Sequence, residues 1–448
     1  MSAELRYWIW LGAALGYASP ALLPLLERFK DAEGVFNASE EELSAIKELH
    51  REERKHLAVH DLSRAEEVAA YCMHAGVRVL TIADEAYPQA LLGIKNPPAV
   101  LYMRGTLPEW NTRPCIALVG ARAMSYYGAS SACEIAYDLG RMGCVTVSGM
   151  ALGLDGIVAA ATLEAKGKTV AVLGSGIDRL YPREHKALYN AILEGGGAII
   201  TEFPPYEGAD AFHFPLRNRI ISGISKAVIL VEGEANSGAL ITARYAKKQG
   251  KSLFAVPGKI NDKSSEAPLL LLKSDASVLT CADDIYDRFK EEYFSSLNPF
   301  ALLPKHSISP ESVMRKYGVA VGREKTKEKS LLVKSDADAK PQFLQKIRRF
   351  LGGEKEETAK PPVLPTEADT AQSRSDKRQA LDEERRRSLS PEEYAIYAML
   401  DFDTPKHPDE LSSDAGTVNQ ISAQLVMMEV LGCVTLIPGG SYLKNENQ

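Results

Sequence analysis

Between residues 114 and 258 the chain alternates short apolar runs with longer stretches of helical periodicity. Each run ends in a glycine or a small polar residue, as a strand does where it meets a loop. In the stretch from Ala132 to Leu139, apolar residues recur at helical spacing until Gly143, which is a helix stop. This alternation predicts an α/β domain: a doubly wound parallel sheet with helices on both faces. The predicted strands are 115–119, 144–147, 169–173, 198–201, 227–231 and 252–256.

Residues 1–105 predict a small helical domain and its connection to the sheet, with a short strand at 77–82. The segment from Tyr7 to Leu26 carries no charge and is formally long enough to span a membrane. Its glycines and prolines favour two short helices joined at residues 17–20 instead. Ser39 and Glu42 have the spacing of a capping box.

The sheet domain is expected to occupy residues 106–295, and the order weakens after it. Residues 323–388 hold 17 basic and 13 acidic residues, a composition too polar to fold alone, so 296–389 is predicted to be a charged, disordered linker. Residues 390–448 predict a winged-helix-like domain. Its helices would begin at Ser390 and Pro408 and span 417–431, before a terminal hairpin.

The formal net charge of −6 argues against a surface that is basic throughout. Residues 113–251, however, hold 15 lysines and arginines against 12 acidic residues, so a polyanion site is expected there. The six cysteines are scattered, which fits a reducing cytoplasm and neither a disulfide framework nor a zinc cluster.

In an open parallel sheet, ligands bind beyond the carboxyl ends of the strands, where helix N-termini present free N–H groups. The glycine-containing loops at these ends predict a row of anion contacts, although each glycine could also serve only a tight turn. None matches a dinucleotide or Walker fingerprint, so no cofactor is expected. The candidate residues in these loops are Gly120, Arg122, Ser148, Gly149, Gly174, Ser237 and Gly238.

Residues 212–219 combine aromatic rings, an amide and two arginines. Aromatic faces stack on bases and guanidinium groups bind phosphates, so this segment predicts contacts with single-stranded DNA. The alternative is a helix start with a buried ring and solvated arginines. Lys168 could contact DNA or merely complement a helix dipole, as could the basic residues late in the helix 238–249, and Lys251 lies beyond the Gly250 stop of that helix. The further candidates are Phe214, Arg217, Asn218, Arg219, Lys168 and Lys251.

The sequence offers little support for catalysis. No histidine stands at a spacing that would complete a triad, and no Cys/His cluster could hold zinc. Asp155 and Asp178 are better placed to orient loops, although a carboxylate cluster in a cleft could hydrolyse a glycosidic bond. The chain is therefore expected not to be an enzyme.

With these residues in view, the chain resembles the DNA-processing protein A family (DprA, also called Smf). The resemblance covers residues 5–283 and, more weakly, 390–443. It rests on an ordered set of motifs at 119–122 with 127–128, 148–155, 171–178 with 181–182, 214–223, 237–238 with 242–243, and 254–258.

The resemblance implies an extended Rossmann-like domain that binds single-stranded DNA and helps to load RecA recombinase during natural transformation. It also implies a helical domain of sterile-alpha-motif or helix-hairpin-helix type, a terminal winged helix and a homodimer. The family's phosphate-binding arginine falls on Arg122, and its late basic residue falls on Lys251. Its aromatic and arginine element falls on Phe214, Pro215, Arg217, Asn218 and Arg219.

Three positions depart from the family pattern. Ala159 stands where a histidine is usual, His185 where an asparagine follows Tyr-Pro, and residues 267–272 replace a Gly-Ser-Asn segment. The last departure leaves the closing loop of the sheet in question. The leading hypothesis is a non-catalytic DNA-binding protein, and the alternative is a nucleotide-processing enzyme of the phosphoribohydrolase type.

Overall fold

A computed structural model describes residues 4–235, 237–302, 308–322, 378–386, 389, 391–411, 421, 424–425, 428–429, 432–436 and 441–445. The chain forms two compact units. The first comprises residues 1–49 and 53–326, and the second comprises residues 50–52 and 327–448.

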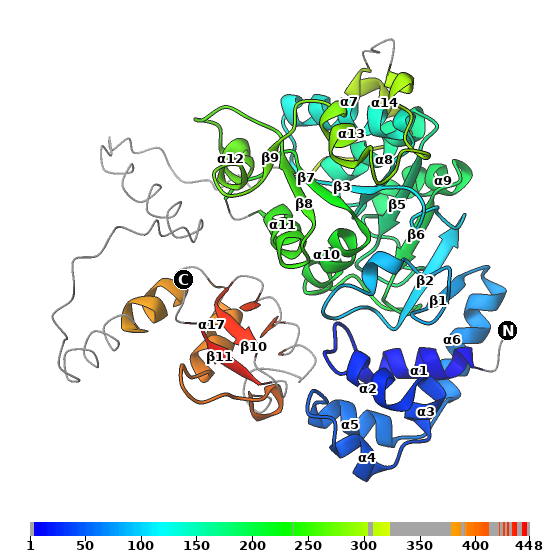
Figure 1. The fold of residues 1–448 in the computed structure, drawn as a ribbon, viewed down its shortest axis with the longest axis vertical. Helices are drawn as coiled ribbons and strands as arrows, with labels where there is room; N and C mark the ends of the chain where they lie inside the picture. Colours follow the sequence, from blue (N-terminus) through cyan, green and yellow to red (C-terminus); the bar gives the residue numbers. More distant parts are fainter. Residues whose placement is uncertain are drawn as a thin grey trace. The chain divides into compact units, whose positions relative to one another are not determined.

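The first unit is built on a nine-stranded sheet with the order β1-β2-β6-β5-β4-β3-β7-β8-β9 (Figure 1). From β6 to β9 all neighbours are parallel, whereas β1 and β2 are antiparallel additions at one edge. This confirms the doubly wound α/β prediction. The strands are β1 (Arg78–Thr81), β2 (Val100–Gly105), β3 (Cys115–Val119), β4 (Val145–Ser148), β5 (Lys168–Val172), β6 (Ala198–Thr201), β7 (Ala227–Leu230), β8 (Ser252–Ala255) and β9 (Ser277–Val278).

All six predicted strands of the central region are present, with ends that agree to within one residue, and the short strand at 77–82 is β1. The sequence did not predict β2 or β9. Because β1 pairs with β2, and β2 pairs with β6, the sheet begins at Arg78 and crosses the boundary predicted at residue 105.

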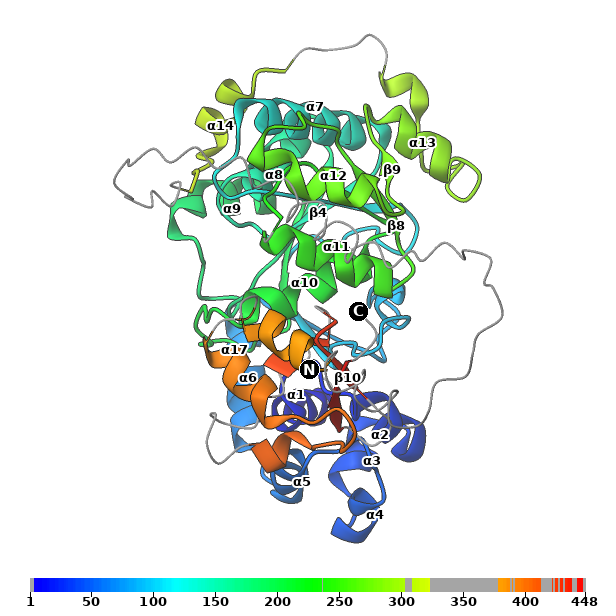
Figure 2. The same ribbon diagram turned by 90° about the vertical axis from the view of Figure 1, so that its left-hand side faces the viewer.

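Helices cover both faces of the sheet, so its strands are buried on both sides. One group, α7, α8 and α9, packs together on β4, β5 and β6, and another, α10 and α11, packs on β3, β5, β7 and β8 (Figure 2). The strand order reverses between β3 and β7, which makes this pair the topological switch point. These helices are α7 (Tyr126–Met142), α8 (Leu154–Glu164), α9 (Lys186–Glu194), α10 (His213–Ile224), α11 (Gly238–Lys248), α12 (Glu266–Leu272) and α13 (Asp283–Phe289). Short 3-10 turns are η1 (Gln89–Leu91), η2 (Arg183–His185), η3 (Lys263–Ser265) and η4 (Pro299–Leu302).

The N-terminal helices confirm two details read from the sequence. The apolar segment forms two short helices, and the Ser39–Glu42 capping box is present with both of its hydrogen bonds. Throughout the described residues, no helix combines the length and the apolar character that crossing a bilayer needs. The helices are α1 (Leu5–Leu15), α2 (Leu22–Phe29), α3 (Ala32–Phe36), α4 (Glu40–Ser44), α5 (Arg51–Ala58) and α6 (Ser63–His74).

A further helix, α14 (Pro310–Tyr317), lies in the segment predicted to be a linker. Ser309 caps its first turn, Gly318 ends it at a φ of 67°, and it packs against α7, α8 and α9 (Figures 1 and 2). The extended residues 319–322 continue from it along the sheet domain. The ordered unit therefore continues beyond residue 295.

The second unit has its own apolar core, which includes Ile396, Tyr397 and Tyr442. Its described elements are α17 (Pro391–Met399), η5 (Pro408–Leu411) and the antiparallel hairpin β10 (Val434–Leu436) and β11 (Tyr442–Lys444). The predicted cap Ser390 and most of the predicted helix 417–431 lie outside the described residues. The hairpin agrees with the sequence, and the winged helix stays a prediction. All six cysteines are free thiols.

Candidate nucleic-acid interface

The carboxyl ends of the parallel strands bring an arginine and two aromatic rings together. Phe214 begins α10 beside the loop after β5, where a Cβ atom on Gly174 would lie 3.0 Å from its ring, so this glycine permits close approach. The Tyr181 ring centroid is 5.4 Å from that of Phe214, and the Arg122 guanidinium carbon is 5.5 Å from it. We call Arg122, Phe214 and Tyr181 the aromatic ridge.

The aromatic ridge is partly open to solvent. Tyr181 is 48% exposed, Arg122 is exposed, and Phe214 is partly exposed. Tyr126, at the start of α7, is 70% exposed and follows the same loop as Arg122. Exposed ring faces with a guanidinium group beside them can stack on unpaired bases and bind a phosphate. The candidate site predicted from the sequence omitted both tyrosines, although aromatic residues in strand-end loops were a usable signal.

Arg217 lies inside the domain rather than on its surface. Its Nη1 donates to the carbonyl oxygens of Gly149, at 2.6 Å, and Val172. Gly149 N–H donates in turn to the Asp155 carboxylate at 2.9 Å, and Ser148 is fully buried beside it. Burial lowers the pKa of Arg217 to about 10 and raises the pKa of Asp155. This network fixes the ends of β4 and β5 below the ridge.

Arg219 is internal as well. Its Nη2 lies 2.5 and 2.6 Å from the two carboxylate oxygens of Glu202, and both side chains are more than nine-tenths buried. Asn218, between the two arginines, is partly exposed. In this element the Phe214 ring is thus partly exposed, whereas the side chains of Arg217 and Arg219 are buried. Of the residues predicted in it, Phe214 and Asn218 can reach solvent.

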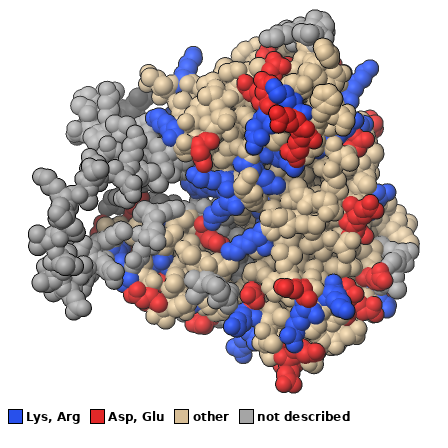
Figure 3. Space-filling view, viewed as in Figure 1, with Lys and Arg blue, Asp and Glu red and all other residues tan. Residues whose placement is uncertain are grey.

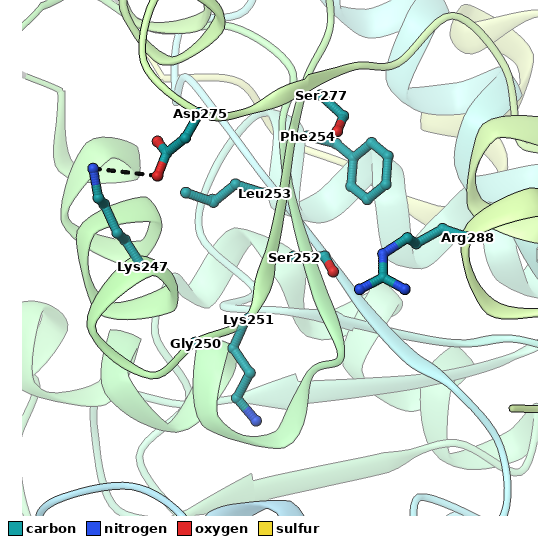
Figure 4. Close-up of a pocket in the computed structure, with 9 residues that line it drawn as sticks. All are labelled: Lys247, Gly250, Lys251, Ser252, Leu253, Phe254, Asp275, Ser277 and Arg288. Carbon is teal, nitrogen blue, oxygen red and sulfur yellow. Dashed lines mark ion pairs between the residues drawn. The ribbon is translucent and has the colours of Figure 1, made fainter. Parts of the chain in front are cut away.

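Lys168 and Lys251 stand at the opposite edge of the sheet. Each comes at or just before the first residue of a strand, and their Nζ atoms donate to the carbonyl oxygens of Gly195, at 3.0 Å, and Gly223, at 2.8 Å. Lys251 lines a cavity of about 330 Å³ with Arg288 and with the ion-paired Lys247 and Asp275 (Figure 4). The structure therefore does not bring these two lysines to the aromatic ridge.

Charge is unevenly distributed over the surface. A group of lysine and arginine side chains gathers near the middle of the face shown in Figure 3, with acidic groups around it. This pattern agrees with a moderate acidic excess in the whole chain and local basic areas.

The loops around β3 and β7 are closely packed. Gly120 lies against Leu154 and the Glu232 carbonyl oxygen, where a Cβ atom would be 2.6 and 3.1 Å from them. Ser237 has the N-cap position of α11 but makes no capping hydrogen bond, and its Oγ is buried without a partner in the described structure. Gly238 is exposed, and a Cβ atom added to it would meet nothing within 4 Å.

The dinucleotide position at the switch point is filled by the protein itself. The Glu232 carboxylate accepts hydrogen bonds from Ser125 N–H at 2.9 Å and Ser125 Oγ at 2.7 Å, at the N-terminus of α7. A Cβ atom on Gly128 would overlap this carboxylate. The helix terminus that cradles a pyrophosphate in dinucleotide-binding domains thus already holds a negative charge.

Residues 319–322 lie against the loops that follow β3 and β4. Gly322 N–H donates to the Arg122 carbonyl oxygen at 2.9 Å, and Ala320 O accepts from Gly153 N–H at 2.8 Å. His185 contacts the same segment. Its Nε2 accepts a hydrogen bond from Ala320 N–H at 3.0 Å, and its Nδ1 donates one to Met150 O at 3.1 Å. The histidine that departs from the family pattern thus links residues 319–322 to the loop after β4.

Replacing His185 with asparagine is expected to loosen residues 308–322. The shorter amide cannot bridge both Met150 and Ala320, and each lost buried hydrogen bond costs about 1–3 kcal/mol. Hydrogen exchange of residues 319–322, followed by mass spectrometry, should accelerate about fivefold or more. Lys316→Ala, which removes a partly exposed ion pair with Glu164 and a contact with the Tyr317 ring, is the control and should change it less. Unchanged protection in His185→Asn would contradict the assignment.

The other two positions that depart from the family pattern, Ala159 and residues 267–272, lie in the packed core of the domain. Ala159 is fully buried within α8. The 267–272 segment forms most of α12, which packs on β8 through residues that include Ala267, Leu270 and Leu271. The altered segment is therefore a short core helix at the closing edge of the sheet.

Comparison with known proteins agrees with this arrangement. The model of the family described as DNA recombination-mediator protein A matches residues 78–290, which include all nine strands. DNA processing protein DprA of Bacillus subtilis is 37% identical over 233 residues, which cover 52% of this chain and 78% of that protein. Protein Smf of Escherichia coli is 40% identical over 207 residues, 46% of this chain and 55% of that protein. The structure of DprA from Streptococcus pneumoniae matches with a TM-score of 0.55 and 30% identity, over 63% of this chain and 97% of that one.

Proposed function

This chain belongs to the DNA-processing protein A family, and on that premise we propose that it binds single-stranded DNA along the aromatic ridge. The observation that carries the proposal is the cluster of Tyr181, Phe214 and Arg122 at the carboxyl edge of the sheet, in which the two rings are tilted by 51°. Tyr181 is 48% exposed, and Phe214 is partly exposed and lies against Gly174. A single strand offers unpaired bases to such rings and phosphates to the arginine, whereas the bases of a duplex are already stacked.

The finer parts of the proposal follow the family's description as a recombination mediator. We propose that the bound strand is protected and passed to RecA recombinase, that transformation is the setting, and that the protein works as a homodimer in the cytoplasm. Sedimentation of the full chain and RecA filament assembly on a coated single strand would test the dimer and the loading step. The buried network below the ridge supports a rigid binding surface rather than a catalytic centre.

The second candidate function is a nucleotide-processing enzyme of the phosphoribohydrolase type. The observation that favours such an enzyme is a set of buried carboxylates near the strand ends, namely Asp155, Glu202 and Glu232. Each already has partners within the domain: backbone N–H groups, Arg219 and Ser125 respectively. These contacts support a structural role, rather than a catalytic one, for the three carboxylates. Release of free base from nucleoside monophosphates by the purified protein would reverse this ranking.

The DNA proposal is tested by fluorescence anisotropy of labelled poly-dT, with duplex DNA as the comparison, across a salt series. We expect tighter binding to the single strand. We also expect the affinity to fall as salt rises, because each neutralised phosphate contributes about 0.7 to the logarithmic slope. Binding that is independent of salt, or absent at low salt, would contradict the proposal.

A further inference from the structure

Two carboxylates in the loop between β6 and α10 converge with a histidine at the first residue of α10. Figure 1 shows the positions of β6 and α10 in the fold. The three residues are Glu207, Asp210 and His213, whose ligand atoms lie within 4.8 Å of one another. They stand at intervals of three residues, and the last of them begins α10. We propose that they bind a divalent transition-metal cation.

The orientation of the His213 ring is fixed by its surroundings. The side chain is fully buried, and its ring packs on Phe203 at 4.0 Å and on Tyr17 at 5.4 Å between centroids. Nδ1 lies 3.1 Å from the Gly208 carbonyl oxygen, which can only accept, and this favours a proton on Nδ1. Asp210 N–H also lies 3.4 Å from Nδ1, but a protonated Nδ1 cannot accept from it, and the shorter contact with Gly208 sets the tautomer.

The other ring nitrogen, Nε2, is buried. Among the described residues no hydrogen bond of ordinary geometry reaches it, although the Gly174 backbone lies close enough to His213 to favour its protonated form. Nε2 faces Glu207 Oε1 at 3.8 Å, which is too far for a hydrogen bond. A metal-bound histidine commonly has this arrangement, with one nitrogen held by a backbone carbonyl and the other presenting its lone pair to the ion.

The two carboxylates lack a cationic side chain to balance them. In the described structure no lysine or arginine forms an ion pair with Glu207 or Asp210. Neighbouring acids and a neutral imidazole are the groups that a bound cation would stabilise.

The chemistry of these ligands indicates the class of metal. One imidazole nitrogen and two carboxylate oxygens suit Zn²⁺, Mn²⁺ or Co²⁺, whereas Ca²⁺ and Mg²⁺ favour oxygen alone. At bond lengths near 2.1 Å, tetrahedral ligand atoms lie about 3.4 Å apart, so a modest movement of the partly exposed Glu207 and the exposed Asp210 closes the site. The ion would hold the loop directly before Phe214.

The test is titration of metal-stripped full-length protein with Zn²⁺ by calorimetry, and with Co²⁺ by visible absorption. We expect one ion per chain, Co²⁺ bands typical of a protein site, and slower hydrogen exchange in residues 206–213. Asp210→Asn should lower the affinity at least tenfold. Because Asp210 is exposed, this variant should fold.

The matched control is Glu194→Gln, which neutralises an exposed acid at the end of α9 and should leave binding unchanged. His213→Gln, checked by circular dichroism, is a second variant and should abolish the Co²⁺ bands if it folds. Absence of stoichiometric binding by the wild type, or equal affinity in Asp210→Asn, overturns the proposal. These outcomes are independent of DNA binding, which is measured separately.

Discussion

Replacing Arg122 with alanine is expected to weaken binding to poly-dT about ten- to hundredfold at low salt. The guanidinium group lies over the Phe214 ring, where it can contact a phosphate while the ring stacks on a base. A hydrogen bond to a charged group contributes about 1.5–3 kcal/mol, and each 1.4 kcal/mol corresponds to a factor of ten in affinity. The salt dependence should also become shallower, by about 0.7 in the logarithmic slope. Fluorescence anisotropy across a salt series measures both quantities.

Arg288 provides a closely matched control. Its guanidinium carbon lies 5.3 Å from the centroid of the Phe289 ring, much as Arg122 lies over Phe214, but it is on α13 and lines the cavity of Figure 4. Arg288→Ala removes the same charge and the same kind of contact elsewhere. We expect its affinity to stay within about threefold of the wild type. Equal losses in the two variants would mean that general charge, rather than the aromatic ridge, governs binding.

The sequence was a good guide to the sheet because its strands are buried on both faces. Continuous apolar runs such as 115–119 and 227–231 need no knowledge of their neighbours to be identified as strands. The edge strands were harder. β2 follows a proline-rich turn and pairs antiparallel with a strand almost a hundred residues away, and β9 has two exposed residues. Pairings at a sheet edge depend on distant segments, which local patterns do not reveal.

The candidate site shows a similar division. Arg122 and Phe214 follow from loop position and residue type, and the structure places both at the carboxyl edge. The burial of Arg217 does not follow from the local sequence, because it depends on carbonyl groups that β4 and β5 bring to α10. Lys168, by contrast, could have been assigned correctly. It precedes an apolar run, so the rule that puts ligands at the carboxyl ends already puts it at the other edge.

The contact between residues 319–322 and Arg122 was also beyond sequence reasoning. The surrounding segment is rich in charge. Among its described residues, those that pack on the apolar core before Val319 are Ile308, Val313, Met314 and Tyr317. Nothing in the composition specifies that the backbone of Gly322 reaches Arg122. The aromatic ridge thus depends on a segment that follows the family-matched region.

Replacing Glu202 with glutamine is expected to destabilise the sheet domain by about 3–5 kcal/mol. The substitution keeps the shape of the side chain but leaves the buried Arg219 guanidinium without a counter-charge. Two of its other nitrogens, Nε and Nη1, already lack partners within the described structure, so no second acceptor is at hand. For a domain of this size the midpoint of thermal unfolding should fall by about 6–20 °C. Calorimetry of the full chain measures it.

Two comparisons separate this effect from a general loss of charge. Asp287→Asn breaks an exposed pair with Lys290 and should cost less than about 1 kcal/mol. Pairing Glu202→Gln with Arg219→Met removes both buried charges and should recover much of the stability. A Glu202→Gln protein as stable as the wild type would mean that the pair is solvated. Below its melting temperature this variant should still bind poly-dT, because Arg219 lies inside the domain and the residue proposed to contact DNA on the same helix is Phe214.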